Sequence, residues 1–473
     1  MSVAASYMTI CEQLKKEANL VDRTWILDRV QQFGDLPAVV EKDQCITFDA
    51  IAQSARNWLT NESITEHSIV VINGVFNATT LGLILGAYIK QCTIVPLFNS
   101  DAAQVETIIN AVHPDVLCDT RDDTICCTTL ATLSPTKHAL LKQLVTQGAS
   151  GLILYSSGST GTPKAILLSL DKLLQRYQVY KEQATSTIAG FLFFDHIGGL
   201  DVLMQCLMTG CTLVSMTKRT PEDVCQAIEK HRINVLPTTP TFLNMVLINR
   251  SYQRADLSSL TVIAYGSEVM PQATLDLLQQ ALPHVTLKQT YGMSELGVLP
   301  TESKAGNSLW LKIKKTDYKV QDGVLWVKSP TAMLGYLNQD HPTLNDGWLC
   351  TGDLVEQRGE YIRILGRQST VINVAGEKVF PAEIEALLLQ IPFVKNSSVW
   401  GKKSPITGKI VAATIYTDDG VDPLQAKKHI LDICKRTLAP YKIPRHFEFV
   451  NGQYHSERFK KINKIQGTIT SGK

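Results

Sequence analysis

A loop rich in glycine and hydroxyl residues lies between two apolar runs and limits how this part of the chain can fold. The apolar runs cover residues 151–154 and 165–168, and the loop between them, from Tyr155 to Lys164, reads YSSGSTGTPK. Short apolar runs bounded by turn residues predict two strands joined by a loop. Glycines allow backbone N–H groups to turn toward an anion, hydroxyl groups donate hydrogen bonds, and a lysine adds a fixed positive charge. The pattern therefore predicts a phosphate-binding loop, but not a Walker A loop, in which Ser or Thr follows the lysine.

The order of residues in this loop resembles the phosphate loop of the AMP-forming adenylating superfamily, which includes acyl-CoA ligases, adenylation domains of peptide synthetases and luciferases. The resemblance implies that Thr160 and Lys164 take part in catalysis. It also implies that the neighbouring small residues bind the nucleotide phosphates; these are Ser156, Ser157, Gly158, Ser159 and Gly161. Taken alone, the loop is also compatible with a flexible polar turn.

A second segment, residues 291–295 with the sequence YGMSE, resembles another motif of this superfamily. In the family the aromatic ring stacks on adenine, the hydroxyl contacts the α-phosphate and the carboxylate helps to hold Mg²⁺. The resemblance therefore implies that Tyr291, Gly292 and Ser294 bind the nucleotide, that Glu295 is catalytic and a metal ligand, and that Met293 lies beside the substrate. The alternative is a helix start, with Ser294 as its cap and Glu295 in the first turn.

Three shorter matches complete the expected nucleotide site. The segment AYGSE at residues 264–268 resembles the strand end that lines the edge of adenine, which implies nucleotide binding by Gly266, Ser267 and Glu268. Asp353, in a Thr-Gly-Asp sequence, matches the aspartate that accepts hydrogen bonds from both ribose hydroxyls. An ionised carboxylate suits that role because it only accepts. Arg367, after Gly366, matches an arginine that contacts ribose and phosphate.

Segments in the C-terminal part of the chain resemble the family's mobile elements. Residues 371–385 resemble the loop that moves onto the active site for the second half-reaction and lines the pantetheine channel, with Gly376 at its centre. Ser369 stands at the position of the hinge, where relatives usually have Asp or Lys. Residues 460–464, KKINK, resemble a Gly-Lys-Ile-Asp-Arg motif, which makes Lys461 the expected catalytic lysine. Lys460 and Lys464 are the alternatives, and a solvated basic tail is a further one.

The segment FFDHIGGL at residues 193–200 bears on the substrate. Acyl-CoA ligases have a similar Phe-His-x-Gly-Gly-Leu sequence, followed by a glycine fourteen positions after the histidine, as Gly210 follows His196 here. The resemblance places His196, Gly198 and Gly199 near the acyl group. Peptide-synthetase domains instead use an aspartate for the substrate's amino group, a role that Asp195 could fill. Its spacing fits less well, and a non-amino carboxylic acid is favoured.

Composition excludes several classes of protein. The chain has 473 residues, of which 44% are hydrophobic, so it can bury large cores and should form more than one domain. A net charge of +2 argues against a nucleic-acid binder. We expect no signal peptide, no transmembrane segment and a cytoplasmic location. Eleven cysteines without paired CxxC spacing are expected to be reduced thiols.

Alternating strand and helix patterns predict an α/β fold with parallel sheets covered by helices. Helical patterns cover residues 49–59, 101–112, 171–184, 220–230 and 272–281. Strand patterns cover residues 68–72, 92–96, 116–118, 212–216, 235–236 and 262–265. The resemblance adds the domain division, with a large N-terminal adenylate-forming domain of helix-covered sheets (residues 1–368) and a small mobile α+β C-terminal lid (residues 369–473).

The expected reaction is the ATP-dependent activation of a carboxylic acid to acyl-AMP, with pyrophosphate release, followed by thioester formation with CoA. The cofactors implied by the resemblance are ATP, Mg²⁺ and CoA or a phosphopantetheinyl carrier. Three alternatives remain: an acyl-AMP ligase that loads a carrier protein or an amine, an amino-acid adenylating enzyme, and a non-catalytic nucleotide-binding homologue. The sequence leaves open which acid is activated, and it does not indicate the oligomeric state.

Overall fold

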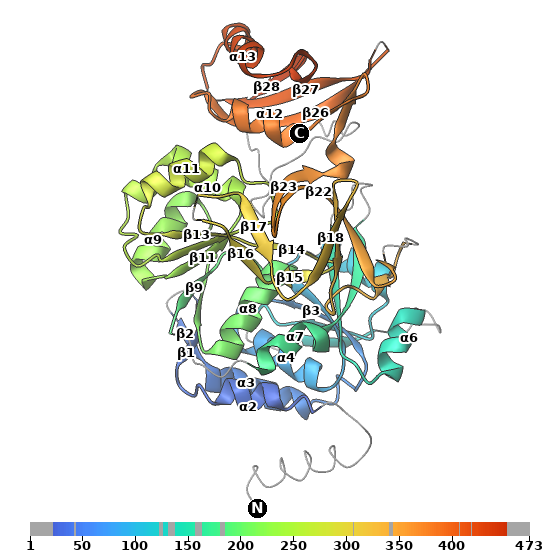
Figure 1. Cartoon of the computed structure of the whole chain (residues 1–473). Helices are drawn as coiled ribbons and strands as arrows, with labels where there is room; N and C mark the ends of the chain where they lie inside the picture. Colours follow the sequence, from blue (N-terminus) through green and yellow to red (C-terminus); the bar gives the residue numbers. More distant parts are fainter. Residues whose placement is uncertain are drawn as a thin grey trace, which may run out of the picture.

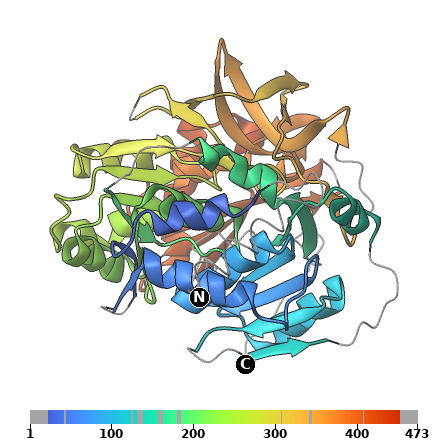
Figure 2. The same cartoon turned by 90° about the horizontal axis from the view of Figure 1, so that it is seen from below.

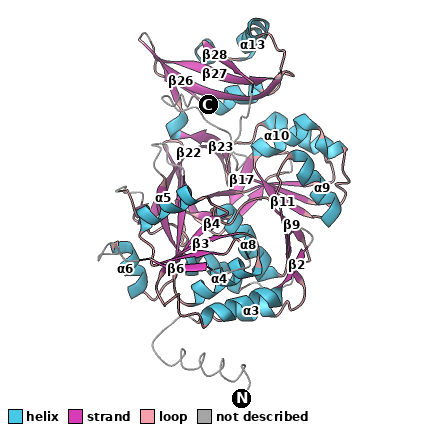
Figure 3. Cartoon of the chain, turned by 180° about the vertical axis from the view of Figure 1, so that it is seen from behind, coloured by secondary structure: helices cyan, strands magenta, loops and turns pink. Residues whose placement is uncertain are grey.

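The larger, N-terminal part of the chain contains two seven-stranded sheets that are covered by helices (Figures 1 and 3). The computed structural model describes residues 22–41, 44–122, 126–130, 138–156, 163–179, 185–305, 307–339, 344–405, 407–417 and 419–451. The first sheet has the order β13-β12-β11-β9-β10-β1-β2 and is parallel except for the edge pair β1–β2. Its strands are β1 (Pro37–Glu41), β2 (Gln44–Thr47), β9 (Thr187–Gly190), β10 (Thr212–Ser215), β11 (Val235–Thr238), β12 (Val262–Tyr265) and β13 (Thr286–Gln289).

The second sheet is mixed, with the order β20-β8-β7-β4-β3-β5-β6. Its strands are β3 (Ile69–Gly74), β4 (Thr93–Phe98), β5 (Val116–Asp119), β6 (Cys126–Thr129), β7 (Gly151–Ser156), β8 (Lys164–Ser169) and β20 (Gly335–Tyr336). The central strands β5, β3, β4 and β7 run parallel, whereas β6, β8 and β20 run antiparallel to their neighbours. The predicted pair of strands around the phosphate loop is therefore confirmed as the antiparallel pair β7–β8.

Helices cover these sheets, as the sequence predicts. They are α2 (Trp25–Gln31), α3 (Phe48–Leu59), α4 (Ala78–Ile89), α5 (Ala102–Val112), α6 (Ala139–Thr146), α7 (Leu170–Gln178), α8 (Ile197–Thr209), α9 (Pro221–His231), α10 (Pro240–Asn249) and α11 (Gln272–Ala281). Figure 2 shows α2 and α3 lying side by side across the underside of the molecule. Two expected helix starts are N-caps, because the side chains of Asp101 and Thr220 accept hydrogen bonds from Gln104 N and Asp223 N.

A third, antiparallel sheet and a separate C-terminal unit follow. The third sheet consists of β16 (Thr301–Ser303), β17 (Trp310–Ile313), β18 (Asp317–Gln321), β19 (Val324–Lys328), β21 (Leu344–Asn345), β22 (Trp348–Arg358) and β23 (Tyr361–Arg367). The C-terminal unit contains β24 (Ile372–Val374), β25 (Glu377–Val379), α12 (Pro381–Leu388), β26 (Val394–Ser404), β27 (Gly408–Thr417), α13 (Pro423–Thr437) and β28 (His446–Val450). This unit has its own hydrophobic core and stands at the top of Figure 1. The structure thus confirms an α/β fold with a large N-terminal domain and a smaller C-terminal one.

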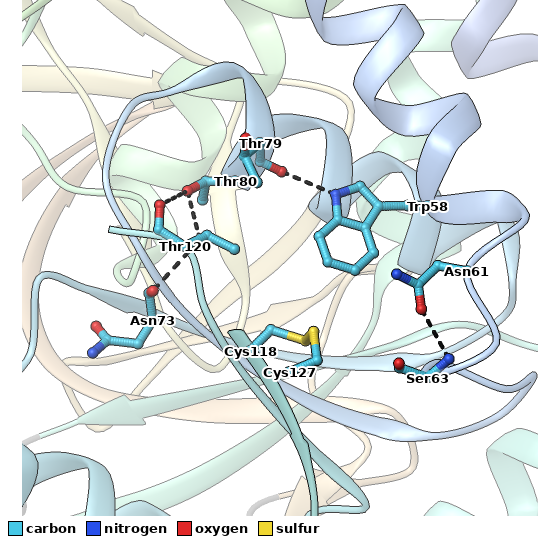
Figure 4. Close-up of a disulfide and its surroundings, with 9 residues drawn as sticks. All are labelled: Trp58, Asn61, Ser63, Asn73, Thr79, Thr80, Cys118, Thr120 and Cys127. Atoms are coloured by element: carbon cyan, nitrogen blue, oxygen red, sulfur yellow. Dashed lines mark hydrogen bonds between the residues drawn. A yellow bond between two sulfur atoms is a disulfide. The ribbon is translucent and has the colours of Figure 1, made fainter. Parts of the chain in front are cut away.

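The expectation that all cysteines are reduced is wrong for one pair. Cys118 and Cys127 form a disulfide, with their Cα atoms 4.3 Å apart (Figure 4). The two residues stand directly opposite each other in the antiparallel pair β5–β6, so the chain reversal between them brings the thiols together. Sequence spacing alone did not indicate that pairing. Within the described ranges, no helix is long and apolar enough to cross a membrane.

A buried ion pair fastens the start of the described chain to the second sheet. The Arg23 guanidinium donates to both carboxylate oxygens of Asp171, at 2.7 and 3.0 Å, and also to Gly148 O at 2.6 Å. Ser150 N donates to the same carboxylate at 2.7 Å. The exposed fractions of the two side chains are 3% for Arg23 and 19% for Asp171. Loss of one partner would therefore leave a largely desolvated charge.

We predict that Arg23→Ala lowers the free energy of unfolding of the N-terminal domain by about 3 kcal/mol, because it leaves Asp171 unpaired in a poorly solvated site. Arg254→Ala removes a similar pair with Glu222, but those side chains are 59% and 41% exposed. This control should cost less than about 1 kcal/mol. Urea unfolding followed by fluorescence measures both values, and equal losses would contradict the prediction.

Candidate active site

The six parallel strands of the first sheet end at the same edge and place the predicted segments there. The loop from residue 191 follows β9, Gly266–Glu268 follows β12, and the YGMSE segment follows β13. In parallel sheets, ligands bind beyond the carboxyl ends of the strands because the connecting loops and helix starts meet there. The fold therefore explains why segments more than 70 residues apart in sequence can contribute to one site.

A buried carboxylate joins three of the predicted nucleotide-binding residues. Tyr291 Oη donates to Asp353 Oδ2 at 2.7 Å, and Arg367 Nε lies 2.8 Å from Asp353 Oδ1. Arg367 also donates to Thr351 O at 3.1 Å. Asp353 and Arg367 are register partners in the pair β22–β23, so this strand pairing fixes their separation. The structure thus brings Tyr291, Asp353 and Arg367 together; their roles toward adenine and ribose stay predictions.

Burial sets the titration of this cluster. Asp353 is 7% exposed, and desolvation raises its pKa above the ordinary value, although the Arg367 charge and the Tyr291 hydrogen bond oppose that rise. Desolvation and the charge of Asp353 also raise the pKa of the Tyr291 phenol far above its usual range. The phenol consequently stays protonated and remains a donor to the carboxylate.

Two glycines allow the chain segments to approach closely at this edge. A Cβ atom at Gly266 would lie 2.4 Å from Thr290 Oγ1, and one at Gly292 would lie 2.6 Å from Gly297 O. Ser267 has a positive φ of 71°, which turns the chain back after β12. Glu268 accepts hydrogen bonds from both the backbone N and the Oγ1 of Thr241, at 3.2 and 2.7 Å, at the start of α10. These contacts shape the predicted adenine edge.

Glu295 lies in a hairpin turn rather than in a helix. The YGMSE segment forms β14 (Tyr291–Met293), which pairs with β15 (Gly297–Leu299), and residues 294–296 form the turn between them. The alternative of a helix start at Ser294 is therefore wrong, because the chain reverses at Glu295 and pairs as a two-stranded ribbon. Tyr336 Oη donates to Glu295 Oε1 at 3.0 Å. The Lys164 Nζ lies 5.1 Å from the centre of the Tyr336 ring.

Part of the expected site lies outside the described residues. This part consists of Ser157, Gly158, Ser159, Thr160, Gly161 and Lys461. The two ends of the phosphate loop are described, because Ser156 and Lys164 are register partners at the ends of β7 and β8. Gly376 lies in the turn between β24 and β25 with φ of 92°, and Ser369 is exposed in the 3₁₀ turn η2 (Gln368–Thr370).

Some of the predicted substrate residues are needed for packing, whereas others border open space. His196 is the N-cap of α8. A Cβ atom at Gly199 would lie 1.9 Å from Phe193 O, whereas one at Gly198 would meet only Leu192 Cδ1 at 3.5 Å. Met293, at the end of β14, is partly buried. Gly199 is therefore required for packing, while Gly198 has room for a neighbouring ligand.

Comparison with known proteins assigns the family. The model of the AMP-binding enzyme family matches residues 26–337, and that of its C-terminal domain matches residues 383–460. The chain belongs to the AMP-binding enzyme family. It is 32% identical to the indoleacetate–CoA ligase of Aromatoleum aromaticum, in a match that covers 63% of each chain, less than two thirds. It is 25% identical to the 2-succinylbenzoate–CoA ligase of Bacillus cytotoxicus, covering 90% of this chain and 94% of that one. The structure of the anthranilate–CoA ligase AuaEII with anthranoyl-AMP has a TM-score of 0.78 at 20% identity and covers 95% of this chain and 96% of that one.

The AMP-binding fold places two residues in the site that sequence reasoning missed. Tyr336 contacts Glu295, and Asn338 contacts the backbone on both sides of Lys164, at Pro163 O and Ala165 N. Neither belongs to a motif that the sequence analysis used. An aromatic and an amide side chain just after Gly335 carry no distinctive signal, so only the pairing of β20 with β8 identifies them.

Magnesium fits this site only together with phosphate oxygens. Among the described residues, no group of three His, Cys, Asp or Glu side chains could hold a metal ion. Glu295 supplies one carboxylate, with Oε1 bound by Tyr336. Mg²⁺ is commonly held by one or two carboxylates plus substrate phosphates, so Glu295 has the right chemistry.

We predict that Gly199→Ala destabilises the protein and that Gly198→Ala does not. The added methyl at position 199 would clash with a backbone carbonyl, whereas at position 198 it enters open space and improves helix propensity by up to about 1 kcal/mol. Thermal unfolding of the two variants, one residue apart, measures the difference. A Gly199→Ala protein as stable as the wild type would refute the close packing at Phe193.

We also predict that ATP affinity falls on acidification with a midpoint above the ordinary Asp pKa of 3.8, because Asp353 protonates early and loses its charge. Acidification has the opposite effect on stability. Above its pKa the ionised, buried Asp353 carboxylate lowers the free energy of unfolding, so protonation of Asp353 does not itself unfold the protein. Dissociation constants measured by calorimetry between pH 4 and 8 test this. Asp353→Asn should bind ATP more weakly at pH 7 and lack this acid limb; an unchanged limb contradicts the assignment.

Proposed function

We propose that this protein is an AMP-forming acid–thiol ligase, which activates a carboxylic acid with ATP and transfers the acyl group to CoA. The observation that carries the proposal is the cluster of Tyr291, Asp353 and Arg367, which combines an aromatic ring, a buried acceptor and a fixed cation. Tyr291 belongs to the hairpin that also holds Glu295. Two of the similar proteins are CoA ligases by name, and both act on acids that contain an aromatic ring.

In the first step, a carboxylate oxygen of the acid attacks the α-phosphorus of ATP. The α–β anhydride bond breaks, and pyrophosphate leaves. Two anions must meet, so catalysis depends mainly on electrostatic stabilisation and positioning. We assign this stabilisation to Lys164 and Thr160 of the phosphate loop. Lys461 would add a further cation from the C-terminal domain. Glu295, together with the phosphates, would hold a magnesium ion, which would neutralise part of the phosphate charge.

In the second step, the thiol sulfur attacks the acyl carbonyl, AMP leaves and the thiol proton passes to solvent. We propose that the C-terminal domain, beginning at Ser369, rotates between the two steps, withdraws Lys461 and brings the Gly376 turn to the site. The exposed turn at Ser369 supports this position of the hinge. Such closure also keeps water from the mixed anhydride.

The acceptor distinguishes this proposal from its alternatives. A carrier-protein thiol or an amine could replace CoA, and an amino acid could replace the non-amino acid. The open Gly198 beside His196 supports an acyl group near the start of α8. A cytoplasmic location belongs to the same proposal.

We predict acid-dependent pyrophosphate release from Mg-ATP across a panel of aryl, arylacetic, fatty and amino acids, and AMP plus acyl-CoA when CoA is present. Lys461→Ala should lower the first step at least a hundredfold, because it removes a cation from the transition state. Coupled assays and mass spectrometry measure these products. Accumulation of acyl-AMP despite CoA would identify another acceptor, and no release with any acid would refute the ligase.

A further inference from the structure

Residues 331–338, which we call the strap, run between two charged residues of the site, Lys164 and Glu295. At one end the strap forms an added edge strand on β8: Leu334 N donates to Leu167 O at 2.8 Å, and Leu337 N donates to Ala165 O at 2.9 Å. Gly335 and Tyr336 make the register pairs of β20 with β8. The strap therefore pairs with the strand that starts at Lys164, directly after the phosphate loop.

The Asn338 side chain extends this pairing beyond the strand. Its Oδ1 accepts from Ala165 N at 3.0 Å, and its Nδ2 donates to Pro163 O at 2.8 Å. These two backbone groups flank Lys164. The Asn338 amide is thus hydrogen-bonded to the peptide groups before and after Lys164. These two bonds fix the backbone at Lys164 and therefore the direction in which its side chain extends from β8.

The other side of the strap holds the turn that carries Glu295. Met333 N donates to Glu295 O at 2.8 Å, and Thr331 Oγ1 donates to Leu296 O at 2.6 Å. Tyr336 Oη donates to Glu295 Oε1 at 3.0 Å. Both the backbone and the carboxylate of Glu295 are therefore held by the same eight-residue segment.

Tyr336 contacts both charges at once. Its hydroxyl binds the Glu295 carboxylate, and its ring faces the Lys164 ammonium at 5.1 Å. Tyr336 is buried. An ionised carboxylate can only accept, so the phenol is the donor in this pair.

We propose that Tyr336 is a positioning residue for Glu295 and that it sets the affinity of the protein for the magnesium form of ATP. With one oxygen of Glu295 held by the phenol at 3.0 Å, the carboxylate has a fixed orientation, and its other oxygen would be the one to bind a metal–phosphate complex. Asn338 has the matching role for Lys164. This inference rests on the proposed function, because it assigns Glu295 to the metal and Lys164 to the phosphates.

The test compares ATP binding with excess Mg²⁺ and in EDTA, by calorimetry, for wild type and Tyr336→Phe. The variant keeps the ring over Lys164 and removes only the hydroxyl. We expect it to weaken Mg-ATP binding about tenfold, because a hydrogen bond to a charged group is lost. Binding of ATP in EDTA should change less than twofold. Equal weakening in both conditions, or no change in either, would overturn the proposal.

Tyr318→Phe is the matched control, since the Tyr318 hydroxyl also donates a hydrogen bond, to Glu360 O at 3.1 Å, in the third sheet. It should leave both dissociation constants unchanged. Asn338→Ala should weaken binding about equally with and without Mg²⁺, because it disturbs Lys164 rather than the metal ligand. A loss confined to the Mg²⁺ condition in that variant would contradict the division of roles.

The outcomes separate this inference from the proposed function. If the wild-type protein binds Mg-ATP but activates no acid, the proposed ligase function is wrong. The role of Tyr336 is then decided by the binding measurements alone. A wild-type protein that binds ATP in neither condition overturns both. Thermal unfolding of each variant shows whether a change in binding reflects a loss of folded protein.

Discussion

The site is organised around one buried carboxylate, that of Asp353. It lies in β22 of the third sheet, yet it binds Tyr291, which follows the last strand of the first sheet, and Arg367 in β23. A buried aspartate is costly unless it is paired and hydrogen-bonded, so these partners are required by the fold as well as suited to a nucleotide. Both carboxylate oxygens are engaged. A ribose that uses Asp353 must therefore share these oxygens or displace the half-exposed Arg367, whose side chain is 50% exposed.

The strap fixes the relative position of a cation and an anion that lie on separate elements. Lys164 begins a strand of the second sheet, while Glu295 lies in a hairpin turn that belongs to neither large sheet. Left alone, a short two-stranded ribbon is only marginally stable and would not hold a carboxylate precisely. Hydrogen bonds from Met333 and Tyr336 join the turn to β8 and so to the core of the second sheet. Rigid support of this kind is what electrostatic catalysis requires.

The sequence predicts those features that local pattern determines. The strands around the phosphate loop and the helices α3 and α5 follow from periodicity and from turn residues. The family resemblance names Tyr291, Asp353 and Arg367 for the nucleotide; the structure brings the three together, and their roles stay predictions. Features that depend on long-range pairing were missed. Tyr336 reaches Glu295 from 41 residues away, and the Cys118–Cys127 bridge depends on a chain reversal. From its sequence alone, the YGMSE segment fits a helix start as well as a hairpin, because the same residue types favour helix caps and turns. Only the pairing with β15 distinguishes the two.

Strand pairing supports the proposed domain boundary at residue 369. The pair β22–β23 ends with Asp353 opposite Arg367, so Arg367 stays with the N-terminal domain in any rotation that preserves the third sheet. Ser369, two residues later, lies in an exposed 3₁₀ turn whose geometry can change without breaking a strand pair. Rotation there would break the bond from Asn244 Nδ2 in α10 to Lys395 O, a single neutral hydrogen bond of 3.2 Å worth about 1 kcal/mol. The predicted nucleotide contacts of Arg367 would thus persist while the C-terminal domain rotates, which is the behaviour that the two proposed half-reactions on one bound nucleotide require.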